Sequence, residues 1–142
     1  MATNSNNQNP NLNGLNKLIG TWKLGGDTSG TVIYEWMEGG FFLVQHIDMQ
    51  LFGNNIKSIE LIGNWKPFGS EADKTIRSRA YDNAGNTLDY VYELNGDTLT
   101  IWGGEKGSPS YFKGKFSKDG KINTGEWVYP SGGYKSTMRK IK

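Results

Sequence analysis

Three tight-turn dipeptides constrain the fold of this chain more than any other feature of its sequence. They are Gly39-Gly40, Asn95-Gly96 and Asp119-Gly120, and each lies between two runs of alternating apolar and polar residues. Such pairs tolerate the positive φ angles of a two-residue β-hairpin, so each one predicts two antiparallel strands joined by a tight turn. The sequence therefore predicts a sheet that is built from successive hairpins.

The remaining alternating runs extend this pattern to about ten strands. We expect strands over residues 20–24, 31–38, 41–50, 56–65, 74–82, 87–94, 98–102, 110–117, 122–129 and 134–141. Short connections make sequence neighbours antiparallel, and an open meander of this size would leave two exposed edges. Closure removes those edges. The predicted fold is therefore all-β, a ten-stranded antiparallel up-and-down barrel, with a two-sheet sandwich as the alternative.

The composition agrees with this fold class and excludes other classes of protein. The chain has 20 glycines in 142 residues and 13% aromatic residues, as expected for many turns and β-rich runs. It has no cysteine, which excludes disulfides and thiolate sites. Scattered charges with a net value of +2 do not favour nucleic-acid binding. No apolar run is long enough for a membrane span, and without a signal-peptide pattern we expect a cytoplasmic protein.

The N-terminal segment predicts a short helix before the first strand. Residues 1–11 are polar and rich in Asn, so we expect a disordered lead, followed by one barrel domain over residues 12–142. Leu12, Leu15 and Ile19 have helical spacing. A segment this short is not stable alone, so we interpret it as a helical plug that packs on one end of the barrel.

The predicted inner faces of the strands are rich in aromatic side chains. Two-residue hairpin loops would pair Trp36 with Leu43, Tyr92 with Leu99 and Phe112 with Trp127. One interpretation is a lining for a small, largely apolar ligand, and the other is the filled core of an interaction module. A ten-stranded barrel has more interior than side chains usually fill, which favours a cavity. The candidate lining residues on these faces are Tyr34, Trp36, Gln45, Trp65, Tyr90, Tyr92, Phe112 and Trp127.

Arg77 and Arg79 share one face of the strand expected over 74–82. If they pointed inward, they could hold a ligand carboxylate by bidentate hydrogen bonds. The apolar phase of the same strand, Ile76 and Ala80, favours the opposite orientation. Both arginines are retained as candidate ligand-binding residues, and the orientation of this strand stays open.

An enzymatic function is the alternative hypothesis, and it depends on His46, the only histidine. His46 and Asp48 share a face, and Glu35 lies diagonally across the hairpin, so an acid–base group at the barrel mouth is conceivable. One histidine falls short of an ordinary metal-ligand set, and we expect no metal or cofactor. A catalytic carboxylate pair drawn from Glu35, Glu60 and Glu126 is a weaker possibility.

The face of the first hairpin that carries His46 is partly apolar. Outward apolar patches of this kind often mark self-association. This face predicts a homodimer, through Ile33, Met37, Phe42 and Val44.

The motifs at the two ends of the barrel resemble those of the calycins, the superfamily of lipocalins and fatty-acid-binding proteins. The matching residues are Gly20, Thr21 and Trp22 on the first strand and Arg139 on the last. The resemblance implies that Trp22 closes one end of the barrel and that Arg139 stacks on its indole ring.

A narrower resemblance covers residues 12–142. The segments LNKLIGTW, YEWMEGGFFL (34–43) and LIGNW (61–65) are similar to a family of bacterial lipocalin-like domains without an established activity. Nitrobindin-like haem barrels share only the architecture. They use a histidine near the C-terminal end, and this chain has none beyond His46, which counts against haem.

Overall fold

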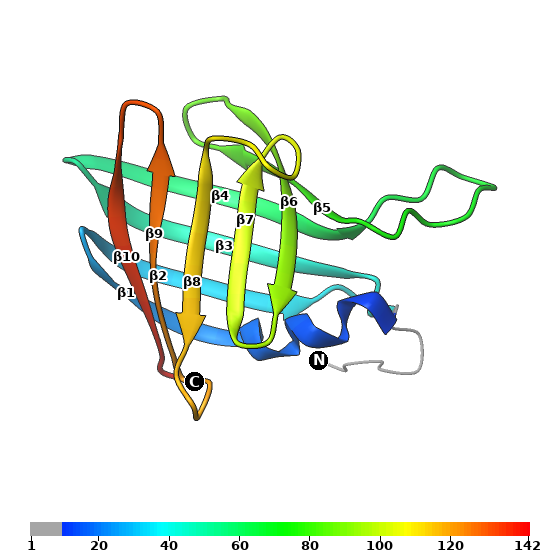
Figure 1. The fold of residues 1–142 in the computed structure, drawn as a ribbon, viewed down its shortest axis with the longest axis horizontal. Coiled ribbons are helices and arrows are strands. Elements are labelled where there is room, and N and C mark those ends of the chain that lie inside the picture. Colours follow the sequence, from blue (N-terminus) through cyan, green and yellow to red (C-terminus); the bar gives the residue numbers. More distant parts are fainter. Residues whose placement is uncertain (1–9) are drawn as a thin grey trace.

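Residues 10–142 of a computed structural model form one closed barrel of ten antiparallel strands (Figure 1). Each strand pairs with its neighbours in sequence, and β1 pairs with β10 to close the sheet. The predicted up-and-down barrel is therefore confirmed, and the sandwich is excluded. Most of the predicted disordered lead falls on residues 1–9, which lie outside the described part of the chain.

A 3-10 helix precedes the barrel, and its first two residues belong to the predicted lead. The elements are η2 (Pro10–Leu18), β1 (Gly20–Gly26), β2 (Thr28–Trp36), β3 (Phe42–Leu51), β4 (Asn54–Asn64), β5 (Ile76–Asp82), β6 (Thr87–Asn95), β7 (Thr98–Gly103), β8 (Tyr111–Phe116), β9 (Ile122–Tyr129) and β10 (Gly132–Lys140).

The link between β1 and β2 is shorter than expected. The predicted strands over residues 20–24 and 31–38 leave residues 25–30 between them, whereas β1 extends to Gly26 and β2 begins at Thr28, so that Asp27 alone links them. The Thr28 hydroxyl donates to the Gly25 carbonyl at 2.8 Å, and an Asp27 carboxylate oxygen accepts from the Lys135 amide at 2.7 Å. These two side-chain hydrogen bonds stabilise the short connection.

Helix η2 closes the barrel end at which β6 turns into β7 (Figure 1). Its side chains Leu12, Leu15 and Leu18 are buried, and Trp22 is fully buried beside them. The indole Nε1 of Trp22 donates to the Leu18 carbonyl at 2.7 Å. The Trp36 indole Nε1 donates to Asn16 Oδ1 at 3.0 Å. The predicted helical plug is therefore present, and hydrogen bonds join it to two strands.

Gly20 is required where the first strand meets the C-terminus. It has a φ of +134°, and a Cβ atom there would lie 2.5 Å from the Lys142 carbonyl oxygen. The Thr21 amide donates to that same carbonyl at 2.9 Å. Glycine lets the two ends of the chain approach this closely, which gives a physical reason for its predicted structural role.

The predicted partner of Trp22 is wrong by one residue. Arg139 is exposed on the outer surface, whereas the Lys140 ammonium lies 5.1 Å from the centre of the Trp22 ring. Successive residues of a strand point to opposite faces. Met138 points into the core, so Lys140 shares its side of the sheet and Arg139 does not.

We expect Lys140→Met to lower the free energy of unfolding by about 0.5–1 kcal/mol, because it removes the cation from the Trp22 ring but keeps an apolar stem. Urea denaturation measures this change. Arg139→Met is the matched control and should change stability by less than about 0.5 kcal/mol. A larger loss for Arg139→Met than for Lys140→Met would contradict the assignment.

Two of the three predicted hairpins have the expected register, and the third is shifted. Trp36 pairs with Leu43 across the Gly39-Gly40 turn, and Phe112 pairs with Trp127. At the Asn95-Gly96 turn, Asn95 still pairs with Thr98, so Tyr92 faces Ile101 instead of the predicted Leu99. A shift of two residues keeps every side chain on its predicted face.

Candidate functional site

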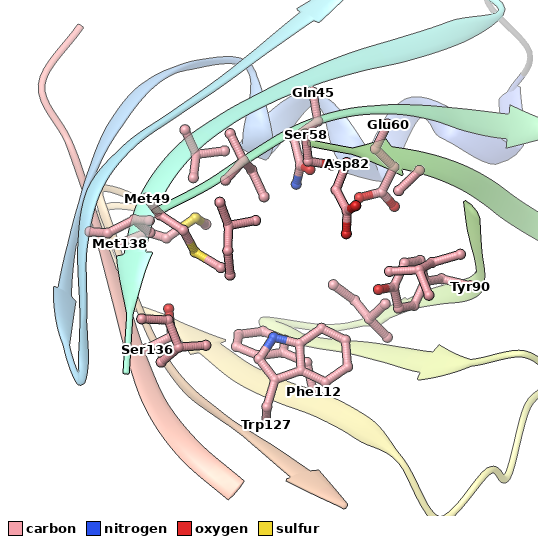
Figure 2. A pocket seen from close by; sticks show the side chains of 18 of the residues that line it. Gln45, Met49, Ser58, Glu60, Asp82, Tyr90, Phe112, Trp127, Ser136 and Met138 are labelled. Atoms are coloured by element: carbon pink, nitrogen blue, oxygen red, sulfur yellow. The ribbon is translucent and has the colours of Figure 1, made fainter. Parts of the chain in front are cut away.

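The barrel encloses an open cavity of about 280 Å³ (Figure 2). Its wall includes Leu51, Asp82 and Tyr134, which lie near the turns at the end opposite η2. The core residues beside η2, such as Leu43 and Ile62, do not line it. The cavity therefore lies toward the end of the barrel that η2 leaves open.

The structure places six of the ten candidate ligand-binding residues in the cavity wall. Trp36 is buried but lies against η2, outside this wall. Whether the six bind a ligand stays a prediction. They come from strands all around the barrel, and they are Tyr34, Gln45, Tyr90, Tyr92, Phe112 and Trp127.

Trp65, Arg77 and Arg79 do not line the interior: the predicted inward position of Trp65 is wrong, and the inward orientation left open for the two arginines is excluded. Trp65 is 37% exposed on the outer surface, and both guanidinium groups lie over its ring, at 5.5 and 5.2 Å. Arg77 pairs with Asp73 and Glu105, and Arg79 binds Asp89 through two hydrogen bonds. The inner positions of β5 belong to Ile76, Ser78 and Ala80, so the arginines point outward.

Strand β4 has the opposite phase to the predicted one. Its buried inner residues are Glu60, Ile62 and Asn64, whereas Ile59 and Leu61 point outward. The outer face of β4 is apolar here because Leu61 belongs to a surface depression that Trp65, Met37 and Phe42 also line. As a result, sequence reasoning missed Glu60 as an interior residue. The signal that could have indicated it is a carboxylate between the apolar residues Ile59 and Leu61.

Mid-strand glycines in the hairpin of β8 and β9 make room for an aromatic ring. A Cβ atom on either Gly114 or Gly125 would clash with the side chain of Phe112. These two glycines face one another across the hairpin. Phe112 also lies 5.7 Å from Trp127, ring centre to ring centre. The glycines therefore position one aromatic wall of the cavity.

Polar side chains gather on the wall opposite these aromatic rings (Figure 2). Glu60 is 5% exposed, and its Oε2 accepts a hydrogen bond of 2.6 Å from the Tyr92 hydroxyl. The Gln45 amide donates to the Tyr34 hydroxyl oxygen at 2.7 Å. The other amide atom, Gln45 Oε1, is buried and has no hydrogen-bond partner within residues 10–142. The cavity thus joins a small polar cluster to an apolar volume.

Burial sets the protonation of this cluster. It raises the pKa of Glu60 above its ordinary value, and the hydrogen bond from the Tyr92 hydroxyl offsets only part of the rise. Burial also raises the pKa of Tyr34, Tyr90 and Tyr92, and the nearby Glu60 carboxylate is the second cause. The three phenols are therefore neutral hydrogen-bond donors at physiological pH.

Glu60 should make the stability of the protein fall as the pH rises. Its pKa is raised by folding, so its contribution is fully present below the ordinary carboxyl pKa of about 4.3 and is lost as pH rises through the native pKa. We expect the free energy of unfolding of the wild type to decline relative to that of Glu60→Gln over this interval. Urea denaturation across a pH series measures the difference.

The matched control for this experiment is Glu126→Gln, which removes an exposed carboxylate from β9. The difference between its free energy of unfolding and that of the wild type should be the same at every pH. A Glu60→Gln curve that also stays parallel to the wild type would contradict the burial of an ionisable group at this position.

The predicted acid–base group lies outside the barrel rather than at its mouth. His46 Nε2 is 3.4 Å from Glu35 Oε2 on the outer surface, and both side chains are about half exposed. Asp48 lies nearest to Lys57, at 4.0 Å. In the part of the chain that the structure describes, no three His, Cys, Asp or Glu residues are grouped to hold a metal. Nothing in this geometry brings His46 to the cavity.

Comparisons with known proteins leave the architecture as the main guide to function. The sequence matches no protein-family model, and no curated protein gives a significant match. Membership of the calycins therefore stays a prediction, although the ten-stranded barrel is consistent with the ligand-binding fold of lipocalins and fatty-acid-binding proteins. Within residues 10–142, no helix is both long and apolar enough to cross a membrane.

Proposed function

We propose that this protein reversibly binds one small, largely apolar molecule in the barrel cavity. The observation that carries the proposal is the unfilled volume of about 280 Å³ inside a barrel whose other end is tightly packed. An engineered apolar cavity of about 150 Å³ already holds benzene. The smallest pockets that bind drug-sized ligands have volumes of about 300 Å³. A ligand with a short alkyl chain or one or two rings matches this size.

The chemistry of the wall supports the same function. Most lining residues are aliphatic, aromatic or Met, and the polar groups are few and concentrated on one wall (Figure 2). Apolar surface supplies affinity, whereas a few fixed polar groups orient the ligand. Access is through the end that η2 leaves open, where Phe52 at the turn between β3 and β4 is 66% exposed.

The two alternative functions have less support. A module with a filled core would leave no volume of this size. An enzyme based on His46 would act on the outer surface, where that side chain is paired with Glu35 and does not line the barrel cavity.

A fluorescence titration tests the proposal. The probe is N-phenyl-1-naphthylamine, a neutral molecule that becomes fluorescent in apolar surroundings. We expect saturation at one probe per chain and displacement by octan-1-ol. Probe fluorescence that does not saturate, or that octan-1-ol fails to displace, would count against a defined interior site. Native mass spectrometry of protein purified without added ligand would identify a retained natural ligand.

We also propose self-association through the outer face of β2 and β3. Ile33 and Met37 are 38% and 40% exposed there, and Phe42 and Val44 lie beside them. Burying such a patch between two copies removes apolar surface from water. In sedimentation experiments we expect a wild-type dimer, a monomeric Met37→Glu variant, and an unchanged dimer for the control Thr124→Glu on β9. A wild type that stays monomeric at high concentration would refute this proposal.

A further inference from the structure

The cavity wall carries acidic side chains and no basic ones. Glu60 and Asp82 point into the cavity from the neighbouring strands β4 and β5 (Figure 2). None of the lysines, arginines or the histidine of residues 10–142 lines the cavity, although the chain has 16 Lys and Arg in total. Arg77 and Arg79, the residues that could have bound an anion, lie outside with Trp65. A ligand carboxylate would therefore find no cationic partner in the wall and would face like charges.

Two buried hydrogen-bond acceptors of the wall, on Gln45 and Glu60, have capacity for a further donor. The Gln45 amide N–H donates a hydrogen bond to the Tyr34 hydroxyl oxygen. Its buried Oε1 has no hydrogen-bond partner among the described residues. Glu60 receives one hydrogen bond, from Tyr92, at Oε2. A buried acceptor without a partner costs free energy, which a ligand that donates hydrogen bonds would recover. The Gln45 and Glu60 oxygens are therefore suited to a ligand that donates hydrogen bonds.

Aromatic faces complete the environment. Tyr90 and Trp127 lie with their ring centres 5.9 Å apart on the cavity wall, and Phe112 packs against Trp127. The faces of such rings attract cations. An organic cation would therefore meet carboxylates on one wall and aromatic rings on the other, and its apolar part would fill the remaining volume.

We propose that the ligand is an amphipathic amine whose ammonium group faces Glu60 and Gln45 and whose apolar part fills the cavity. This inference rests on the proposed binding function and specifies its ligand class. The ammonium supplies the positive charge and the donors that the buried carboxylate and the amide oxygen lack. Asp82 lies closer to the mouth. Its carboxylate already accepts hydrogen bonds from Ala84 and Asn86, so Glu60 is the principal partner.

Three ligands with the same chain test the proposal on the wild-type protein: octylamine, octan-1-ol and octanoate. Near neutral pH, octylamine is a cation, octan-1-ol is neutral and octanoate is an anion. The titrations are done at low salt. Dissociation constants come from displacement of N-phenyl-1-naphthylamine. We expect octylamine to bind tightest and octanoate weakest, with roughly a tenfold or larger ratio between these two.

Variants then locate the charge that is responsible. Glu60→Gln keeps the shape of the side chain and should weaken octylamine roughly tenfold or more relative to octan-1-ol on the same variant. Glu126→Gln removes the same charge from the outer surface and should leave all three ligands unchanged. Thermal melting confirms that each variant is folded, and the ratio of octylamine to octanoate in the wild type is informative without any variant.

The outcomes separate this inference from the function on which it rests. If octan-1-ol binds but octylamine binds no more tightly than octanoate, the amine assignment is overturned and the binding function stands. If none of the three displaces the probe, the binding function itself fails. Equal weakening of octylamine by Glu126→Gln and Glu60→Gln would show general attraction to a charged surface and would also overturn the assignment.

Discussion

Trp22→Ala will lower the free energy of unfolding by about 3–5 kcal/mol, the usual cost of removing a large aromatic side chain from a core. Trp22 is fully buried in the cluster formed by η2 and the barrel. Its ring lies 6.3 Å from that of Phe116, and its indole N–H binds the Leu18 carbonyl. The substitution leaves a void between the helix and the strands and a buried carbonyl without its donor.

Urea denaturation of matched variants measures this effect. Trp22→Phe keeps a ring but loses the hydrogen bond, so its stability should lie between the wild type and Trp22→Ala. Trp65→Ala is the control, because Trp65 is a surface tryptophan that lies over two arginines, and it should cost no more than about 1 kcal/mol. Equal losses for Trp22→Ala and Trp65→Ala would mean that η2 and Trp22 do not close the barrel.

Ala80→Trp will reduce the affinity for octan-1-ol by roughly tenfold or more, because an indole ring will occupy part of the ligand volume. Ala80 is 5% exposed, lines the cavity, and lies opposite Glu60 on β4 and Leu88 on β6. An empty cavity accepts a large side chain more easily than a packed core does. We therefore expect an overpacking cost at the low end of the usual range of about 1–3 kcal/mol.

The control for this experiment is Thr124→Trp, which adds the same ring to an exposed position of β9. Displacement titrations on both variants, with melting curves to confirm folding, give the comparison. Unchanged octan-1-ol binding by a folded Ala80→Trp variant would place the binding site elsewhere on the protein.

The strand order could be predicted from the sequence because the turns are chemically explicit. The turns at Gly39-Gly40 and Asp119-Gly120 predict the cross-strand partners in their hairpins without a register error. Asn95-Gly96 gives the correct hairpin with a register error of two residues. Tight turns are local, so their chemistry can be recognised without knowledge of the rest of the fold.

The orientation of strands with two apolar faces could not be predicted in the same way. On β4, Ile59 and Leu61 point outward while Ile62 points inward. Hydrophobic alternation carries no information when both faces are apolar. This ambiguity put Trp65 in the predicted lining and left Glu60 out. On β10, the role that the resemblance to the calycins assigned to Arg139 belongs to Lys140, which shares the inner side of the strand with Met138.

The binding of octan-1-ol in the barrel is tested most directly by NMR on the ¹⁵N-labelled protein. We predict saturable shifts of backbone amides in strands that surround the cavity, among them Gln45, Glu60, Ala80 and Leu99. Amides of exposed residues in the loop between β4 and β5, such as Ser70 and Glu71, should not move. Shifts confined to the outer surface around Trp65, or shifts that grow linearly without saturation, would contradict a ligand site inside the barrel.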